Sequence, residues 1–315
     1  MTAPEESLST SDAPRIREML LRRRVALERK WERRIARGGP GSGDYLARIR
    51  LPEMLMRAAG LWQRGRRNAM LPQLRSIQVF YPDLPPHLEG LRILHVSDLH
   101  FHAEIPEFAE VVRNLLSGVN ADLCAITGDF RFSHRGGYAH VFTAMETVLS
   151  GIHSTHGTFA VLGNHDLAAF VVPFESMGIR VLMNANVAVR HAGGDLWIAG
   201  VDDHHRFRCD SLKAAVDGIP EGGFTLLLAH SPELALDAPR YGVRLYLCGH
   251  THWGQIRFPL LGALSYNARC PKQFRMDRWT HETMEGYTTA GIGTTDLPIR
   301  YNCPPEACLI ELARA

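Results

Sequence analysis

The stretch Leu91-Arg92-Ile93-Leu94-His95-Val96 is a short, mostly aliphatic run that leads directly into Ser97-Asp98-Leu99-His100. Runs of about five or six apolar residues, bounded by glycine or polar residues, are typical of buried strands. Four later runs have the same form, and each precedes side chains that can bind divalent cations. They are 122–127 before Gly128-Asp129, 158–162 before Gly163-Asn164-His165-Asp166, 224–229 before His230, and 243–248 before Gly249-His250-Thr251-His252. The sequence therefore predicts five core strands, each with a polar cluster at its carboxyl end.

The residue types in these clusters indicate a two-metal site for phosphoryl chemistry. In sheets built from α/β units, ligands bind at the carboxyl ends of the strands. Asp, Asn and His together suit Mn, Fe, Zn, Ni or Mg, whereas the absence of cysteine from all five clusters argues against a structural zinc site. Two ions roughly 4 Å apart can clamp the attacking and leaving oxygens and acidify a water. One ligand must bridge the ions, and a carboxylate can do so, which leaves Asp129 or Asp98 as the candidate.

The ordered set of motifs resembles the calcineurin-like metallophosphoesterases from about Leu91 to Leu312. The resemblance implies a first ion bound by Asp98, His100, Asp129 and His252, and a second bound by Asp129, Asn164, His230 and His250, with Asp129 as the bridge. It further implies that His165 stabilises or protonates the leaving group. Asp166 is then expected to orient the His165 imidazole.

Each motif alone has an ordinary explanation. Asn-His-Asp in a loop is commonly a turn or a helix cap, and His-x-His can be two surface histidines. The joint order of the motifs, each after a predicted strand, favours the metal site. Four further residues are candidate substrate contacts, because a phosphate ester beside metal ions often needs cationic partners, and solvated loop positions are the alternative. They are Arg131, His134, Arg135 and His204.

The remaining pattern predicts an α/β fold. Helices are expected over 107–118, 138–149, 172–177 and 211–217, and further strands over 180–183, 187–191, 196–201, 285–290 and 307–312. Strand–helix units followed by a strand-rich second half indicate two packed sheets with outer helices. The family resemblance implies a four-layer α/β/β/α sandwich of two mixed sheets. We expect residues 77–315 to form the catalytic domain.

Residues 1–76 are predicted to form a basic helical extension. The first 13 residues are expected to be disordered, with helices over 14–36 and about 43–70. The extension has 17 Arg and Lys against 8 Asp and Glu, a balance of +9, whereas the remainder has 18 against 25, a balance of −7. Basic helices that also carry Trp and Leu often lie on anionic membranes, so residues 14–70 are a candidate for peripheral membrane contact. Packing on the catalytic domain or an oligomer contact is the alternative, and nucleic-acid binding is not expected.

The amino-acid composition indicates the class of protein and the cellular compartment. The chain has 315 residues, of which 45% are hydrophobic and 22% charged, as in ordinary globular proteins. Six scattered cysteines form no secreted disulfide pattern, which favours a reducing compartment. No apolar run reaches 18 residues, and Arg22-Arg23-Arg24 precedes no apolar core, so neither a transmembrane helix nor an export signal is expected. We expect a cytoplasmic protein, with any membrane contact on the inner face of the cytoplasmic membrane; the oligomeric state is not predicted.

The expected activity is that of a binuclear phosphodiesterase or pyrophosphatase in which a metal-bridging hydroxide attacks phosphorus. Two Mn ions are the expected cofactor, and Fe, Zn or Mg are the alternatives. The segments 249–255, 291–300 and 302–306 resemble a branch of bacterial phosphodiesterases that includes a UDP-2,3-diacylglucosamine pyrophosphatase of lipid A synthesis. A lipid-linked substrate of that kind is therefore the leading expectation. Deletion of residues 1–76 would then abolish lipid hydrolysis and spare small aryl phosphodiesters. The alternatives are a soluble nucleotide phosphodiesterase or protein phosphatase, and a non-catalytic scaffold.

Overall fold

The computed structural model describes residues 13–37, 44–134, 136–263 and 265–315. Two predictions fall outside this part of the chain, namely the disorder expected for the first residues and the substrate contact expected for Arg135.

Within the described residues, the main strands form two six-stranded mixed sheets. In spatial order the first sheet contains β1 (Gln73–Tyr81), β16 (Glu306–Arg314), β2 (Arg92–Val96), β4 (Leu123–Ile126), β6 (Thr158–Ala160) and β7 (Ile179–Val181). The second contains β14 (Asp277–His281), β15 (Met284–Thr288), β11 (Val243–Cys248), β10 (Thr225–Leu228), β9 (Gly194–Gly200) and β8 (Ala185–His191). The strands that precede the polar clusters are parallel within each sheet, so their carboxyl ends meet at one edge.

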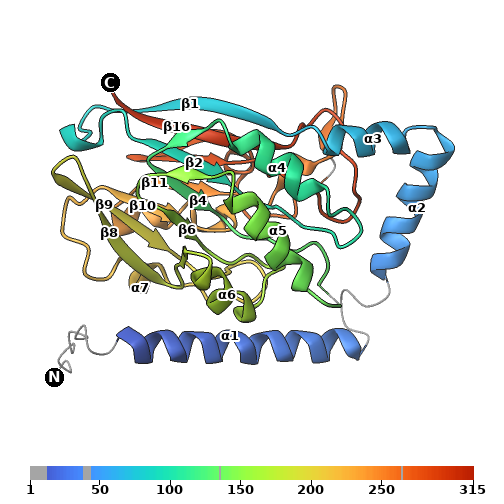
Figure 1. Ribbon diagram of the computed structural model, residues 1–315, viewed down its shortest axis with the longest axis horizontal. Coiled ribbons are helices and arrows are strands. Elements are labelled where there is room, and N and C mark those ends of the chain that lie inside the picture. The colour runs from blue at the N-terminus through green and yellow to red at the C-terminus, as the bar shows by residue number, and fades with distance from the viewer. Residues whose placement is uncertain (1–12, 38–43, 135, 264) are drawn as a thin grey trace.

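The two sheets pack face to face and carry helices on their outer faces. Ile93 and Leu123 of the first sheet share a buried cluster with Leu226 and Leu245 of the second. On the outside, α4 (Phe108–Leu116), α5 (Ala139–Leu149) and α6 (Val171–Ser176) cover the first sheet, and α7 (Leu212–Val216) covers the second (Figure 1). The predicted α/β/β/α sandwich is confirmed, because alternate residues of each strand serve the inner and the outer layer.

Short elements connect these layers. They are β3 (Asn120–Ala121), β5 (His153–Ser154), β12 (Arg257–Phe258), β13 (Gly262–Ala263), η2 (Pro86–Leu88), η3 (Ala168–Phe170), η4 (Pro232–Leu234), η5 (Ala238–Tyr241), η6 (His252–Gly254) and η7 (Lys272–Phe274). β12 and β13 pair as an antiparallel hairpin.

The N-terminal region forms three helices, α1 (Ala13–Ala36), α2 (Asp44–Ala58) and α3 (Trp62–Ala69). In Figure 1, α1 runs along one side of the sandwich, and α2 and α3 lie at one end of it. The single helix expected over about 43–70 is interrupted at Gly60, whose φ of 70° is left-handed and ends α2.

The expected domain boundary at residues 76/77 falls inside β1. Gln73–Tyr81 pair in parallel, residue for residue, with Glu306–Arg314, so residues 73–76 belong to the first sheet. The sequence gives little sign of this strand, because β1 lies at the edge of the sheet and mostly alternates polar or exposed residues with partly buried ones.

Candidate metal centre

Five of the seven expected ligand residues sit in left-handed backbone. Their φ values are 52° for Asp98, 43° for His100, 56° for Asp129, 68° for His250 and 49° for His252. Non-glycine residues rarely adopt such angles, and clusters of them are typical of functional sites. Glycines allow the loops to approach each other, since a Cβ at Gly163 would overlap the Asp129 carboxylate.

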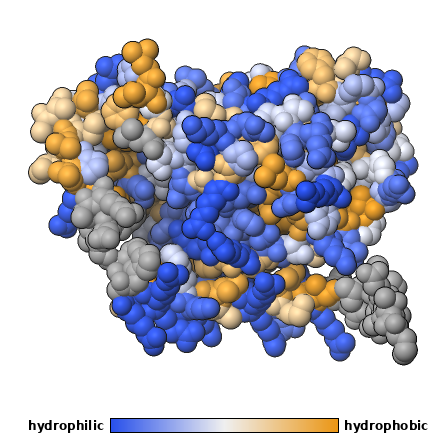
Figure 2. All heavy atoms as spheres, turned by 180° about the vertical axis from the view of Figure 1, so that it is seen from behind, coloured by the Kyte–Doolittle hydropathy of each residue, from blue (hydrophilic) through white to orange (hydrophobic). Residues whose placement is uncertain are grey.

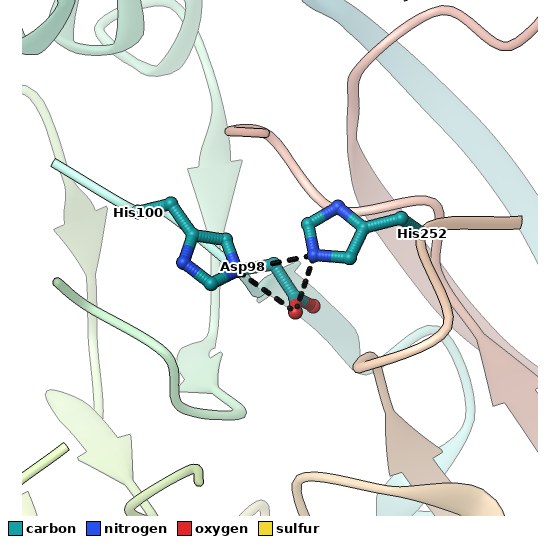
Figure 3. A group of neighbouring side chains, drawn as sticks. All are labelled: Asp98, His100 and His252. Atoms are coloured by element: carbon teal, nitrogen blue, oxygen red, sulfur yellow. Dashed lines mark hydrogen bonds and ion pairs between the residues drawn. The ribbon is translucent and has the colours of Figure 1, made fainter. Parts of the chain in front are cut away.

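The first group of side chains joins the loops after β2 and β11. The Nε2 atom of His252 lies 3.2 Å from Oδ1 of Asp98 and 3.1 Å from Nε2 of His100. His100 Nε2 lies 3.7 Å from Asp98 Oδ1. All three residues are buried and their ligand atoms converge (Figure 3).

The second group joins the loops after β4, β6, β10 and β11. His230 Nε2 lies 3.2 Å from Oδ2 of Asp129, 3.0 Å from Oδ1 of Asn164 and 3.2 Å from Nδ1 of His250. Asp129 Oδ2 also lies 3.6 Å from His100 Nε2, which belongs to the first group. The Asp129 carboxylate is therefore placed between the two groups.

The hydrogen bonds of the histidines direct lone pairs into these groups. Nδ1 of His100 faces the Arg131 carbonyl at 3.1 Å, Nδ1 of His230 faces the Thr127 carbonyl at 2.8 Å, and Nε2 of His250 faces the Asn267 carbonyl at 2.9 Å. A carbonyl only accepts, so each of these nitrogens carries the proton and the other nitrogen of each ring points a lone pair inward. Converging lone pairs and carboxylates repel one another unless a cation lies between them, so this donor set fits two divalent ions.

The electrostatics of the cluster favour positive charge. Burial alone would raise the pKa of Asp98, but the neighbouring His252 and His100 hold it well below its ordinary value. Burial would lower the pKa of His230, but the Asp129 carboxylate raises it to about 10. The site thus attracts positive charge, whether a proton or a metal cation.

Asp166 has a different role from the one expected. Its carboxylate accepts hydrogen bonds from the backbone N–H groups of Asp129, Phe130 and Gly163 at 2.7, 2.8 and 2.7 Å. His165 instead directs Nδ1 at the Phe132 carbonyl, at 2.7 Å. Asp166 therefore ties the loop after β4 to the loop after β6, and a backbone carbonyl orients the His165 ring.

His165 lies at the edge of the cluster in a stack of rings and a guanidinium. Its Nε2 is 3.9 Å from Asp129 Oδ2, and its ring centroid is 3.6 Å from that of His134. Arg206 Nη2 lies 2.9 Å from His134 Nε2, and the Arg206 guanidinium is 5.0 Å from the ring of Trp31 in α1. The pKa of His165 is lowered first by burial and then by the neighbouring His134. The pKa of His134 is lowered first by burial and then by the charge of Arg206, so both rings are held neutral.

The other candidate substrate contacts have protein partners. Arg131 is buried, and it donates through Nε to the His165 carbonyl and through Nη2 to the His134 carbonyl. His204 directs Nδ1 at Asp210 Oδ1, 3.1 Å away. Arg131 therefore holds the backbone at His134 and His165 in place, next to the candidate metal ligands.

Sequence reasoning missed two residues that support the site, Arg24 and Arg206. Arg24, in α1, is fully buried; it forms an ion pair with Asp202 and donates to the carbonyls of Gly163 and Asp166 at 2.9 and 3.0 Å. The sequence feature that could have identified Arg24 is its position among the apolar residues of the predicted helix 14–36. Arg206 donates to the Asn164 carbonyl, and no local pattern indicates this contact.

Comparison with known proteins shows the family to which the sequence is similar. The model of the family described as Calcineurin-like phosphoesterase matches residues 91–254. The uncharacterized metallophosphoesterase YkoQ of Bacillus subtilis is 29% identical, over 79% of this chain and 93% of its own length. The phosphodiesterase YaeI of Escherichia coli is 29% identical over 70% and 82%, and the transmembrane protein with metallophosphoesterase domain of Danio rerio is 30% identical over 78% and 59%.

The chain belongs to the calcineurin-like phosphoesterase family. It is a metal-dependent phosphoester hydrolase, and its Asp and His clusters can bind metal ions.

Proposed function

We propose that the protein is a phosphodiesterase or pyrophosphatase that uses two divalent ions, with Mn first and Fe, Zn or Mg as alternatives. The observation that carries this proposal is the position of Asp129 within reach of both groups of side chains, 3.6 Å from His100 and 3.2 Å from His230. The name of YaeI, a phosphodiesterase, supports diester rather than monoester chemistry.

Each expected ligand then has a place. Asp98, His100 and His252 would hold one ion, Asn164, His230 and His250 the other, and Asp129 both. When bound, the ions would acidify a water and neutralise charge on the phosphoryl group. His165, whose ring is fixed by the Phe132 carbonyl, presents Nε2 to the side of the cluster where the leaving oxygen would depart.

We propose a lipid-linked substrate, with UDP-2,3-diacylglucosamine as the first candidate. The segments that resemble that branch line the metal centre. Arg300, from one of them, is fully buried and donates to the carbonyls of Ala290, Gly291 and Gly293. Gly291 and Gly293 lie directly against Asp98. The segment therefore shapes the first half of the cluster.

The surface near α2 supports contact with the inner face of the cytoplasmic membrane. Leu51, Met54 and Leu55 of α2 are each more than half exposed, and so are Leu260 and Leu261 at the tip of the β12–β13 hairpin. The base of the hairpin and α2 pack against the same buried cluster of Trp62, Leu297 and Ile299, the hairpin through Ile256 and α2 through Met56. Figure 2 shows apolar atoms gathered at this end of the molecule and hydrophilic atoms along α1.

Arginines surround this apolar end, which suits an anionic bilayer. Arg50 and Arg57 of α2 are exposed, as are Arg64, Arg66 and Arg67 near or within α3. Among the described helices, none has both the length and the apolar character needed to cross a bilayer.

The decisive experiment is hydrolysis of UDP-2,3-diacylglucosamine by Mn-loaded protein, with Asn164→Ala as the blank. We expect release of UMP and lipid monophosphate, and a loss of at least about 100-fold in the variant, since even an outer partner of a metal ligand contributes 10- to 100-fold. Cleavage of an aryl phosphodiester without any turnover of the lipid would discard this substrate and keep the metal site.

The alternative functions give different results in the same assay. High turnover of cyclic nucleotides or phosphopeptides without detergent would indicate a soluble phosphodiesterase or a protein phosphatase. Equal rates for wild type and Asn164→Ala on every phosphoester would indicate a scaffold.

A further inference from the structure

A second feature beside the metal centre is a cleft of about 770 Å³ on the side of the second group of ligands. We call it the basic cleft, and its polar lining residues are His205, Ser265, Tyr266, Asn267, Arg269, Lys272 and Arg275. The cleft adjoins His250 directly. The Asn267 carbonyl is 2.9 Å from His250 Nε2, and the centroids of the His205 and His250 rings are 4.2 Å apart.

The basic cleft has an excess of positive charge. No Asp or Glu is among the described residues that line it, whereas Arg269, Lys272 and Arg275 all face it. Glu233, a carboxylate that contacts two of the lining residues, is already engaged, since it lies 3.1 Å from His205 Nδ1 and accepts the Arg269 N–H at 2.7 Å. The three cations thus remain available to an anion that enters the cleft.

Arg275 is held in place for such a contact. Its Nε and Nη2 donate to the Cys270 carbonyl at 3.0 and 2.8 Å, and its guanidinium carbon is 5.9 Å from the Tyr266 ring. In the described part of the chain, its third nitrogen, Nη1, has no hydrogen-bond partner. A guanidinium fixed in this way can bind a phosphate with little further loss of side-chain entropy.

We propose that the basic cleft binds a second phosphate of the substrate, next to the phosphate that is hydrolysed. This proposal rests on the proposed function, because the metal ligands fix where the first phosphate lies. The preferred substrates are then pyrophosphate-linked or nucleoside diphosphate esters rather than simple diesters. A volume of about 770 Å³ is in the range of small-ligand sites and suits a nucleotide-sized group.

The cleft also borders the apolar end of the molecule. Leu261, at the exposed tip of the β12–β13 hairpin, is one of its lining residues. A substrate with a charged diphosphate part and an apolar part could therefore place the diphosphate in the basic cleft and the apolar part against the neighbouring hairpin tip.

The test compares two esters that differ by one phosphate, the 4-nitrophenyl esters of uridine 5′-monophosphate and uridine 5′-diphosphate. In Arg269→Ala/Lys272→Ala, we expect kcat/KM for the diphosphate ester to fall about 10- to 100-fold, in line with the loss of hydrogen bonds to charged groups. For the monophosphate ester we expect a change of less than about 3-fold. Arg180→Ala/Arg190→Ala, which removes the same charge from exposed positions on β7 and β8, should leave both values unchanged.

A binding measurement keeps the two proposals separate. α,β-Methylene-UDP, titrated calorimetrically into Mn-loaded protein, should bind at least about 10-fold more weakly to the cleft variant than to wild type or to the control variant. Equal binding by all three proteins, or an equal loss of kcat/KM for both esters, would overturn the cleft proposal. Absence of turnover by wild type on every phosphoester would overturn the proposed function, and the titration would still decide the role of the cleft.

Discussion

At the scale of the residue, Arg24 supports the site although it lies outside the five motifs. This guanidinium has no exposed surface, and it contacts Asp202 together with two carbonyls of the loop that carries Asn164. Glu28, one turn later, pairs with Arg24 and accepts the Ala168 N–H at 2.7 Å. The position of Asn164 thus depends on two residues of α1.

Arg24→Ala is expected to lower the free energy of unfolding by about 3–5 kcal/mol, because it leaves Asp202 buried without its partner. It should also lower kcat/KM on an aryl phosphodiester through displacement of the Asn164 loop. Chemical denaturation and steady-state kinetics measure the two effects. Arg22→Ala is the matched control, since Arg22 is exposed and its ion-pair partner within the described residues is Glu18 on the same helix. If Arg24→Ala is as stable as this control, the buried pair has no structural role.

At the scale of the element, α1 packs against the loop that carries Asn164. Its buried and partly buried positions recur every three or four residues, at Leu20, Arg24, Glu28 and Trp31. Arg24 and Glu28 contact the loop that carries Asn164, and Trp31 lies under the Arg206 guanidinium. The outer face of α1 is strongly basic. The two alternatives for the extension thus apply to different helices. The contacts of α1 fit packing on the rest of the protein, and the exposed apolar residues of α2 fit contact with a membrane.

This packing changes the expected result of a truncation. Removal of residues 1–76 would delete Arg24, Glu28 and Trp31 and also the first four residues of β1. We therefore expect the truncated protein to lose hydrolysis of small aryl phosphodiesters as well as of lipids. Assays with both substrates, on soluble truncated protein that retains its circular dichroism, decide the point. Wild-type rates on the aryl ester would restore the original expectation.

The exposed stripe of α2 makes its own prediction. Leu51→Ser/Leu55→Ser should weaken co-sedimentation with phosphatidylglycerol vesicles by roughly 10-fold or more, because each buried CH₂ contributes about 0.8 kcal/mol to membrane binding. Val172→Ser/Leu236→Ser is the control, since Val172 and Leu236 are exposed apolar residues on other elements. A similar loss in both variants would show that α2 has no special part in binding.

Elements with local signals were predicted well, and those that depend on distant partners were not. The strands before the metal ligands are short apolar runs, so their residues alone identify them. β1 is recognisable only through β16, more than 230 residues later in the chain. The same distinction holds in the site, where the motifs indicate the ligands but the contact of Arg206 with the Asn164 carbonyl exists only in the folded chain.

At the scale of the whole molecule, the metal centre connects the two sheets. Asp98, His100, Asp129 and Asn164 follow strands of the first sheet, and His230, His250 and His252 follow strands of the second. Bound ions would therefore cross-link the two halves of the sandwich at one edge. The folded state would bind metal more tightly than the unfolded chain, so metal should stabilise the fold.

Removal of metal with a chelator is expected to lower Tm, and Mn²⁺ at 100 times its Kd should restore about 2.7 kcal/mol, which corresponds to roughly 5–10 °C. Differential scanning calorimetry measures the shift. Asn164→Ala/His230→Ala, which lacks two residues of the second group, should show a smaller shift. An identical Tm with chelator and with Mn²⁺ would argue that ions do not bind between the sheets.

The left-handed backbone at Asp98, His100, Asp129, His250 and His252 has a consequence for protein engineering and evolution. Each such conformation disfavours a non-glycine residue by on the order of 1 kcal/mol, so glycine or asparagine at these positions would relieve strain in metal-free protein. Libraries selected for thermal resistance alone would thus be enriched in catalytically dead variants. With aspartate or histidine at all five positions, this chain places the metal-binding side chains where the backbone conformation costs stability.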